Sequence, residues 1–256
     1  MTDQDFNVWE GVYEDWSQAP MDDAVFSSNI WVEKVVERAT KTLESYQELG
    51  GPPPVSFIHE TALPLASAMI FLDDQEPLRI LDFGGGMGSS YLPLRANLPD
   101  RKLIEFHIVE AEAVCQRARE LFSSYPDLHF HQTLPALPDP VHITHLGSSL
   151  QYIDDWAGLI SSFASLKPRY LILTDVFAGD IESFVTIQKF HEKKIRVRFH
   201  NLREFLYTIE QLGFHLIFIS NYYTTIFGKV GPLPMKNFDK KFQLDHACQL
   251  IFKWVG

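Results

Sequence analysis

The sequence has little that would place the protein in an oxidising compartment or in a membrane. Its two cysteines, Cys115 and Cys248, have no CxxC spacing, so both are interpreted as small buried side chains rather than parts of a disulfide framework. No apolar stretch reaches the about 18 residues that suggest a membrane-spanning helix. The first ten residues, MTDQDFNVWE, are acidic and lack the basic and apolar regions of a signal peptide. These absences predict a cytoplasmic protein without a membrane span.

Positive charge is also scarce. The chain has 22 Lys and Arg against 33 Asp and Glu, which gives a formal net charge of −11. Nucleic acids and anionic membranes are bound largely through Lys and Arg, so neither is expected as a general partner. The net charge does not exclude a tRNA or a lipid-linked substrate that is bound by a local basic patch. One basic cluster, KFHEKKIRVRFH at 189–200, could meet an anionic substrate such as a sugar phosphate, or could be a solvated face.

The 256 residues suffice for one large domain with an appendage. Residues 1–51 are predicted to be a helical, aromatic appendage or lid, because Trp31, Val35 and Ala39 recur at helical spacing before the glycines and prolines at 50–54. Residues 52–256 are predicted to form the main domain. Within it we expect a helix over 56–72 and a substrate-side insertion at 178–200.

The main domain is organised around ILDFGGGMGSS, residues 80–90. A buried strand is predicted to end at Asp82 and to enter a glycine turn before a helix. Glycines allow positive φ angles and bring bare N–H groups close to a ligand, and Asp82 adds a fixed negative charge. This pattern predicts a nucleotide-cofactor site. Its candidate glycine contacts are Gly84, Gly85, Gly86 and Gly88.

The order of these residues disfavours a dinucleotide. The fingerprint G-x-G-x-x-G, begun at Gly84, requires glycine at 89, where this chain has Ser89. The observed acid-x-G-x-G-x-G resembles motif I of the class I S-adenosylmethionine (SAM) methyltransferases. In that motif the acidic residue interacts with the cationic end of the cofactor. The resemblance implies a Rossmann-like α/β fold with a seven-stranded, mostly parallel sheet and helices on both faces. It also implies SAM as cofactor and S-adenosylhomocysteine as product.

Later strands are expected to end in further polar residues. Glu110 ends the apolar run FHIVE and lies 24 residues after Gly86, near the offset of about 20 at which an acid binds ribose hydroxyls. Gln132 follows a third strand, where many methyltransferases have an acid for the adenine amine; its side-chain oxygen could accept the same hydrogen bond. Asp175 lies near the end of RYLILTDVF. Because parallel strands end at one edge of a sheet, Asp82, Glu110 and Asp175 are expected to converge there.

Three segments are similar to a methyltransferase family commonly encoded among bacterial surface-polysaccharide (O-antigen and capsule) genes. They are WEGVYEDWSQA near the start, which looks like that family's W-x-G-x-Y-x-x-W, SSLQYIDDW at 148–156, and FVTIQKF at 184–190. The resemblance implies a methyltransferase with a glycan-related role and does not fix the substrate. In the second segment, Ser149 and Gln151 are predicted to line the amino-acid or adenosine part of the cofactor.

Methyl transfer from a sulfonium is an in-line displacement, which requires alignment of the reactants and exclusion of water but no metal. A hydroxyl acceptor also benefits from a general base. We hypothesise that His191 or His200, with Asp175 or Tyr152 nearby, orients and deprotonates the acceptor, because histidine has an ordinary pKa near 6.5. His145, beside the fourth strand, is a further candidate base.

Metal chemistry is a weaker alternative. His129 and His131 would share a face of an extended strand and could chelate an ion, and His142 and His145 are similarly close in sequence. Since no Cys or carboxylate at a matching spacing completes either set, no metal site is predicted.

Other functions stay open. An NAD-dependent oxidoreductase or epimerase shares the strand, the glycine turn and the ribose acid. A non-catalytic SAM-binding partner subunit would keep the fold without turnover, and an amine could be the acceptor in place of a hydroxyl. The expected partner is a small molecule, anionic or carbohydrate, and a homodimer is compatible with the sequence.

Overall fold

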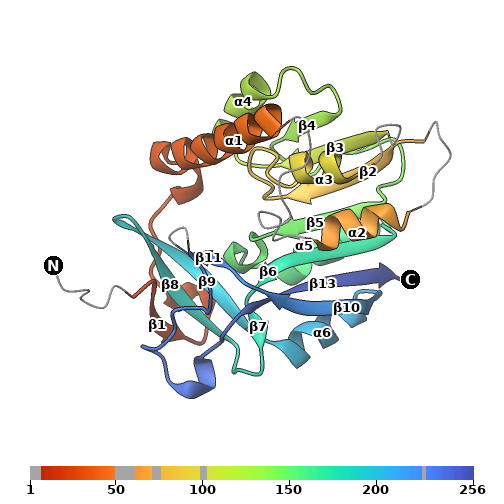
Figure 1. Ribbon diagram of the computed structural model, residues 1–256. Helices are drawn as coiled ribbons and strands as arrows, with labels where there is room; N and C mark the ends of the chain where they lie inside the picture. The colour runs from red at the N-terminus through yellow and green to blue at the C-terminus, as the bar shows by residue number, and fades with distance from the viewer. Residues whose placement is uncertain (1–6, 50–60, 71–75, 99–102, 227–228) are drawn as a thin grey trace.

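The computed structural model describes residues 7–49, 61–70, 76–98, 103–226 and 229–256 (Figure 1). A seven-stranded sheet lies between two layers of helices, and a four-stranded sheet stands beside it. Part of the helix predicted over 56–72 is present as α2 (Ala62–Ala68). The rest of that prediction before residue 61 and after residue 70, and the proline run at 52–54, lie outside the described residues.

The large sheet has the strand order β10-β13-β6-β5-β2-β3-β4. Five of its strands are mutually parallel: β2 (Leu78–Phe83), β3 (Ile104–Val109), β4 (Leu128–His131), β5 (Ile143–Gly147) and β6 (Tyr170–Val176). Strand β13 (Ala247–Trp254) runs antiparallel between β6 and β10 (Phe214–Tyr222). The seven-stranded, mostly parallel sheet expected from the sequence is therefore confirmed.

Helices cover both faces of this sheet. Helices α2, α3 (Tyr91–Asn97) and α4 (Glu112–Leu121) pack over one face, with Ile80 in their shared core. Helices α5 (Trp156–Ser165) and α6 (Leu202–Gln211) pack over the other face, with Leu81 in that core. Because consecutive strand residues point to opposite faces and both faces are covered, the central strands are continuously apolar. This burial explains why they stand out in the sequence.

A smaller sheet, here called the accessory sheet, has the order β1-β8-β9-β7. It comprises β1 (Trp9–Tyr13), β7 (Ala178–Gly179), β8 (Phe184–Phe190) and β9 (Lys193–Asn201). Its core also takes in Leu233, Met235, Phe238 and Leu244 from the connection before β13. In Figure 1 it stands at the end of the large sheet where the parallel strands finish.

The accessory sheet corrects one expectation. The N-terminal segment was expected to be helical, but residues 9–13 form a strand that pairs antiparallel with β8. The partner lies about 175 residues away in the sequence, so local periodicity could not reveal the pairing. The predicted insertion at 178–200 provides β7, β8 and β9.

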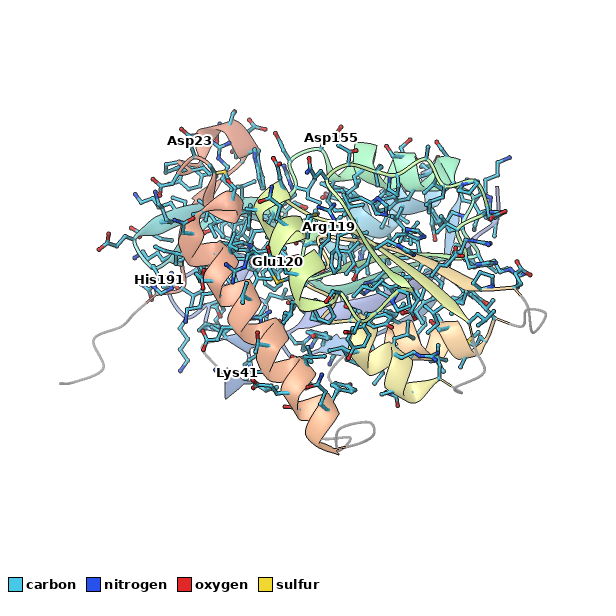
Figure 2. All side chains as sticks on the ribbon, turned by 90° about the horizontal axis from the view of Figure 1, so that it is seen from above. Asp23, Lys41, Arg119, Glu120, Asp155 and His191 are labelled. Atoms are coloured by element: carbon cyan, nitrogen blue, oxygen red, sulfur yellow. The ribbon has the colours of Figure 1, made fainter. Side chains whose placement is uncertain are left out.

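Helix α1 (Asn29–Leu49) confirms the helical part of the N-terminal prediction. It follows the short 3-10 turns η1 (Trp16–Gln18) and η2 (Val25–Ser27) and runs from the accessory sheet to α4, as Figure 2 shows from above. The remaining elements are η4 (Leu150–Tyr152), η5 (Lys240–Phe242) and a hairpin of β11 (Thr225–Ile226) with β12 (Lys229–Val230). None of the helices in the described ranges is long and apolar enough to cross a membrane.

Candidate functional site

Each glycine in the turn after β2 meets a backbone or steric requirement that a larger residue would not meet. Gly84, Gly86 and Gly88 have φ angles of +71°, +59° and +80°, which L side chains rarely adopt. Gly85 lacks such an angle, but a Cβ added there would overlap the carboxylate of Asp82. The turn therefore exposes backbone and brings no side chain between itself and that acid.

Glu110 lies directly against this turn. It follows the end of β3, and its Oε1 accepts a hydrogen bond from the Gly86 N–H at 3.1 Å, while its Oε2 accepts one from the Ala111 N–H at 2.9 Å. Burial raises the pKa of Glu110, and the two backbone hydrogen bonds oppose that effect. The structure thus brings the second strand-end acid to the glycine turn.

Asp82 is paired with a histidine from the neighbouring strand. Asp82 and His145 face each other in the register of β2 and β5, both are 0% exposed, and Nδ1 of His145 lies 2.8 Å from Oδ1 of Asp82. On the other side of the ring, Nε2 lies 3.3 Å from Oγ1 of Thr174 on β6. Oδ2 of Asp82 is buried and has no hydrogen-bond partner in the described part of the chain. From the sequence alone, His145 is a candidate base or metal ligand, and its pairing with Asp82 is not evident.

Asp175 links the ends of several elements. Its Oδ2 accepts a hydrogen bond from the Ser148 hydroxyl at 2.6 Å, and its Oδ1 accepts one from the Thr224 hydroxyl. Ser148 and Asp175 both have positive φ angles, +56° and +57°, an uncommon conformation that often marks functional turns. Ser149, next to this turn, donates to the Phe83 carbonyl at 2.8 Å and lies beside Gly84. Sequence reasoning missed Ser148 and Thr224, whose roles depend on the tertiary structure.

Tyr152 and Gln151 connect this edge of the sheet to the accessory sheet. The Tyr152 hydroxyl donates to Oε1 of Gln188 on β8 at 2.9 Å. Burial, together with the charge of Asp175, raises the pKa of Tyr152, so its phenol is neutral at pH 7. Gln151 is buried, and its Oε1 has no hydrogen-bond partner among the described residues. An amide and a phenol thus lie where the two sheets meet.

Four rings form what we call the aromatic wall: Phe26, Trp31, Tyr152 and Phe190. Their centroids follow one another at 5.4 Å from Tyr152 to Phe26, 4.9 Å from Phe26 to Trp31 and 5.3 Å from Trp31 to Phe190, all in edge-on geometry. All four are partly exposed. The wall joins η2, α1, η4 and β8, so the N-terminal segment borders the same region as Tyr152.

The two histidines proposed as bases have different surroundings. His191 is exposed at the turn between β8 and β9, with a φ of +54°, and lies at the margin of the molecule in Figure 2. His200 is buried between Trp156 and Phe205, with ring centroids 5.1 and 4.8 Å away, and burial, reinforced by Arg198, lowers its pKa to about 3. No described contact joins either histidine to Asp175 or Tyr152. Their catalytic role stays a prediction.

Gln132, predicted to contact the adenine, follows β4 and is exposed. It lies one residue beyond His131, whose carbonyl accepts a hydrogen bond from the Glu110 backbone N–H. Its position at the same edge agrees with the expected one, and its contact with a cofactor stays a prediction.

Much of the basic cluster at 189–200 is already engaged. Lys189 pairs with Glu10 at 2.7 Å, and Arg198 lies 3.4 Å from Asp154 and over the Trp16 ring. The Arg196 Nε donates to a backbone carbonyl at 2.6 Å. These pairs reduce the positive charge that the cluster could offer to an anion.

The histidines on β3 and β4 gather on one face of the sheet. His107 stacks on His129 with centroids 4.8 Å apart, and its Nδ1 lies 3.1 Å from Nε2 of His131. His142, at the start of β5, lies near Glu76 at 3.3 Å. Across the described residues, no group of three or more His, Cys, Asp or Glu is arranged to hold a metal ion.

Comparison with known proteins identifies the fold. No protein-family model and no curated protein sequence matches the chain. Among solved structures, a provisionally named SAM-dependent methyltransferase from Listeria monocytogenes is 11% identical, with a TM-score of 0.51 over 77% of this chain and 100% of that one. A Haloferax volcanii structure, solved as a complex of the Trm112 methyltransferase activator with a provisionally named methyltransferase, gives 14% identity and a TM-score of 0.52 over 84% and 95%.

A third solved structure carries bound ligands. The 1,6-didemethyltoxoflavin-N1-methyltransferase from Burkholderia thailandensis, crystallised with 1,6-didemethyltoxoflavin and S-adenosylhomocysteine, is 15% identical, with a TM-score of 0.50 over 92% and 94% of the two chains. The chain thus has the α/β fold of SAM-dependent methyltransferases. At these identities the likeness establishes the fold, and the chemistry has to be argued from the site.

Proposed function

We propose that the protein is a SAM-dependent methyltransferase acting on a small molecule. The observation that carries this proposal is the glycine turn with an acid on each side of it. Asp82 lies behind Gly85, and Glu110 holds the Gly86 N–H from the next strand. This arrangement lies at the carboxyl edge of a doubly covered, mostly parallel sheet, where such sheets bind ligands. The match to methyltransferase folds supports the same conclusion.

The residues present fit SAM. Because Gly85 has no side chain, the Asp82 carboxylate lies directly against the turn, and its buried Oδ2 provides negative charge there. Glu110 would hold ribose hydroxyls, and Gln132, Ser149 and Gln151 would complete the cofactor contacts at the neighbouring strand ends. When bound, SAM supplies a methyl group on a sulfonium.

Helix α1 and the aromatic wall would exclude water from the reaction. The Val35 side chain of α1 lies 3.5 Å from the position that a Cβ on Gly86 would take, so the helix covers the turn. Exclusion of water protects a reactive cofactor and strengthens electrostatic interactions inside the site. This placement supports a lid function for the predicted appendage at 1–51.

The acceptor side favours a hydroxyl compound such as a sugar or a sugar phosphate, O-methylated in the synthesis of a surface polysaccharide. The likeness of WEGVYEDWSQA, SSLQYIDDW and FVTIQKF to a polysaccharide-associated family supports this finer proposal. So does the combination of Tyr152, Gln151 and Gln188 with aromatic rings, since neutral donors and acceptors suit hydroxyl groups. We propose that Asp175 and Tyr152 orient the acceptor and that His191 or His200 is the general base that deprotonates it.

Calorimetry separates this proposal from its alternatives. The wild-type protein is titrated with SAM, S-adenosylhomocysteine and NAD, with Gly86→Ala as a variant altered in the turn. Micromolar binding of the first two ligands and none of NAD supports the proposal, whereas tight binding of NAD alone would favour the oxidoreductase or epimerase. Sugar phosphates, nucleotide sugars and small amines are then supplied with SAM, and methylated product is measured by mass spectrometry. SAM binding without transfer to any acceptor would favour a non-catalytic partner subunit.

A further inference from the structure

The buried pair of Asp82 and His145 has a role that the proposed function does not yet include. Both side chains are 0% exposed, and a buried carboxylate is stable in its charged form only when hydrogen bonds or opposite charges compensate for lost hydration. Only one of the two carboxylate oxygens, Oδ1, has its partner in this pair. The other oxygen is the one beside Gly85. His145 thus approaches Asp82 from the side opposite the turn.

The contacts of the ring select one tautomer of His145. Its Nε2 lies 3.3 Å from the Thr174 hydroxyl, and its Nδ1 lies 2.8 Å from Asp82. If Thr174 donates to Nε2, the ring proton sits on Nδ1 and is donated to the carboxylate. The pair then carries one net negative charge. This arrangement fixes the position of the carboxylate without neutralising it.

The field of Asp82 already extends to the cofactor side of the turn. The negative charge of Asp82 contributes to the raised pKa of Glu110, after the larger effect of burial. Glu110 in turn bonds the Gly86 N–H. A cation bound over the turn would feel the same charge through a poorly hydrated interior, where screening is weak.

We propose, resting on the proposed function, that His145 is a positioning residue that holds the Asp82 carboxylate turned toward Gly85, so that its negative charge selects the cationic methyl donor. SAM carries a sulfonium and an ammonium, whereas S-adenosylhomocysteine carries only the ammonium. The pair therefore favours SAM over its own product. Product release becomes easier for the same reason, because loss of the methyl group removes one of the two positive charges.

The test compares His145→Leu with a matched control on the same strand. His142→Leu also removes a buried histidine that lies beside an acid, Glu76, but at the opposite end of β5. We expect His145→Leu to weaken SAM binding about tenfold and S-adenosylhomocysteine binding less, because the carboxylate charge is no longer held in place behind the turn. His142→Leu should leave the ratio of the two dissociation constants at its wild-type value. Equal ratios in both variants and the wild type would overturn the inference.

Two further measurements separate positioning from simple structural support. His145→Asn keeps a donor near the place of Nδ1 and should restore most of the preference for SAM. In an Asp82→Asn background, His145→Leu should change the ratio of the two dissociation constants little further, because the carboxylate through which His145 acts is already absent. Additive effects in this cycle would show that His145 does not act through Asp82.

If His145→Leu does not fold, Thr174→Val decides, since it removes only the hydroxyl that fixes the tautomer. A reduced preference for SAM supports the inference, and an unchanged ratio overturns it. Failure of the wild-type protein to bind either ligand would instead refute the proposed function.

Discussion

Trp9→Ala tests whether the first strand belongs to the cooperative core of the protein. Trp9 is 1% exposed and contacts Phe177 and Phe199 edge-on, with centroids 5.6 and 5.4 Å away. Truncation of a buried tryptophan to alanine costs about 3–5 kcal/mol, of which each aromatic pair supplies about 0.5–1.5 kcal/mol. We therefore expect the free energy of unfolding to fall by about 3–5 kcal/mol.

Urea unfolding followed by circular dichroism measures this loss. Val12→Ala is the matched control, because Val12 lies on the same strand but is 42% exposed, and its loss should be within about 0.5 kcal/mol. The loss of unfolding free energy for Trp9→Phe should lie between the losses for Trp9→Ala and Val12→Ala, since phenylalanine keeps an aromatic ring for the edge-on contacts. A loss below about 1 kcal/mol for Trp9→Ala would refute the packing argument, since truncation of a buried tryptophan typically costs about 3–5 kcal/mol. A separate early transition would show that the accessory sheet unfolds independently.

Four other substitutions have defined outcomes. Gly86→Ala should lower the free energy of unfolding by about 1–2 kcal/mol, because residue 86 has a positive φ angle. Gly85→Ala should displace the Asp82 carboxylate, so S-adenosylhomocysteine should no longer raise the melting temperature of this variant. Burial, assisted by His129 and His131, lowers the pKa of His107 to about 4. The wild-type protein should therefore lose stability as the pH falls from about 6.5 to 4, because the unfolded chain takes up the proton first. Urea titrations should show a smaller loss of stability for His107→Leu over the same pH range. Asparagine tolerates the positive φ of residue 191, and His191 is exposed and has no described contact with Asp175 or Tyr152. His191→Asn should therefore keep methyl transfer within about threefold, and a larger loss would identify His191 rather than His200 as the base.

The sequence predicted the central strands and the cofactor turn because their causes are local. Strands buried on both faces are continuously apolar, and the glycine turn shows its conformational requirement directly in the residue type. The acids at 82, 110 and 175 could be placed at one edge because parallel strands share a direction. Helix α1 followed from an equally local pattern, the helical spacing of Trp31, Val35 and Ala39.

The pairings between distant segments could not be read in the same way. Strand β1 finds its partner in β8, and the pairing is set by the assembly of the accessory sheet rather than by any property of residues 9–13. His145 and Asp82 are 63 positions apart and meet only because β5 lies beside β2 in one particular register. The surroundings of His200 likewise depend on the packing of α5 and α6 against β9. Register and helix packing decide these cases, and neither is encoded in a short window.

The accessory sheet also constrains the order in which parts of the protein can fold during translation. Trp9 pairs with Gln188, so the first strand has no partner until the ribosome has translated most of the chain. At typical elongation rates this interval is roughly 10–35 s, during which an aromatic strand edge is available to other proteins. A chaperone that holds this segment during translation would therefore raise the yield of native protein.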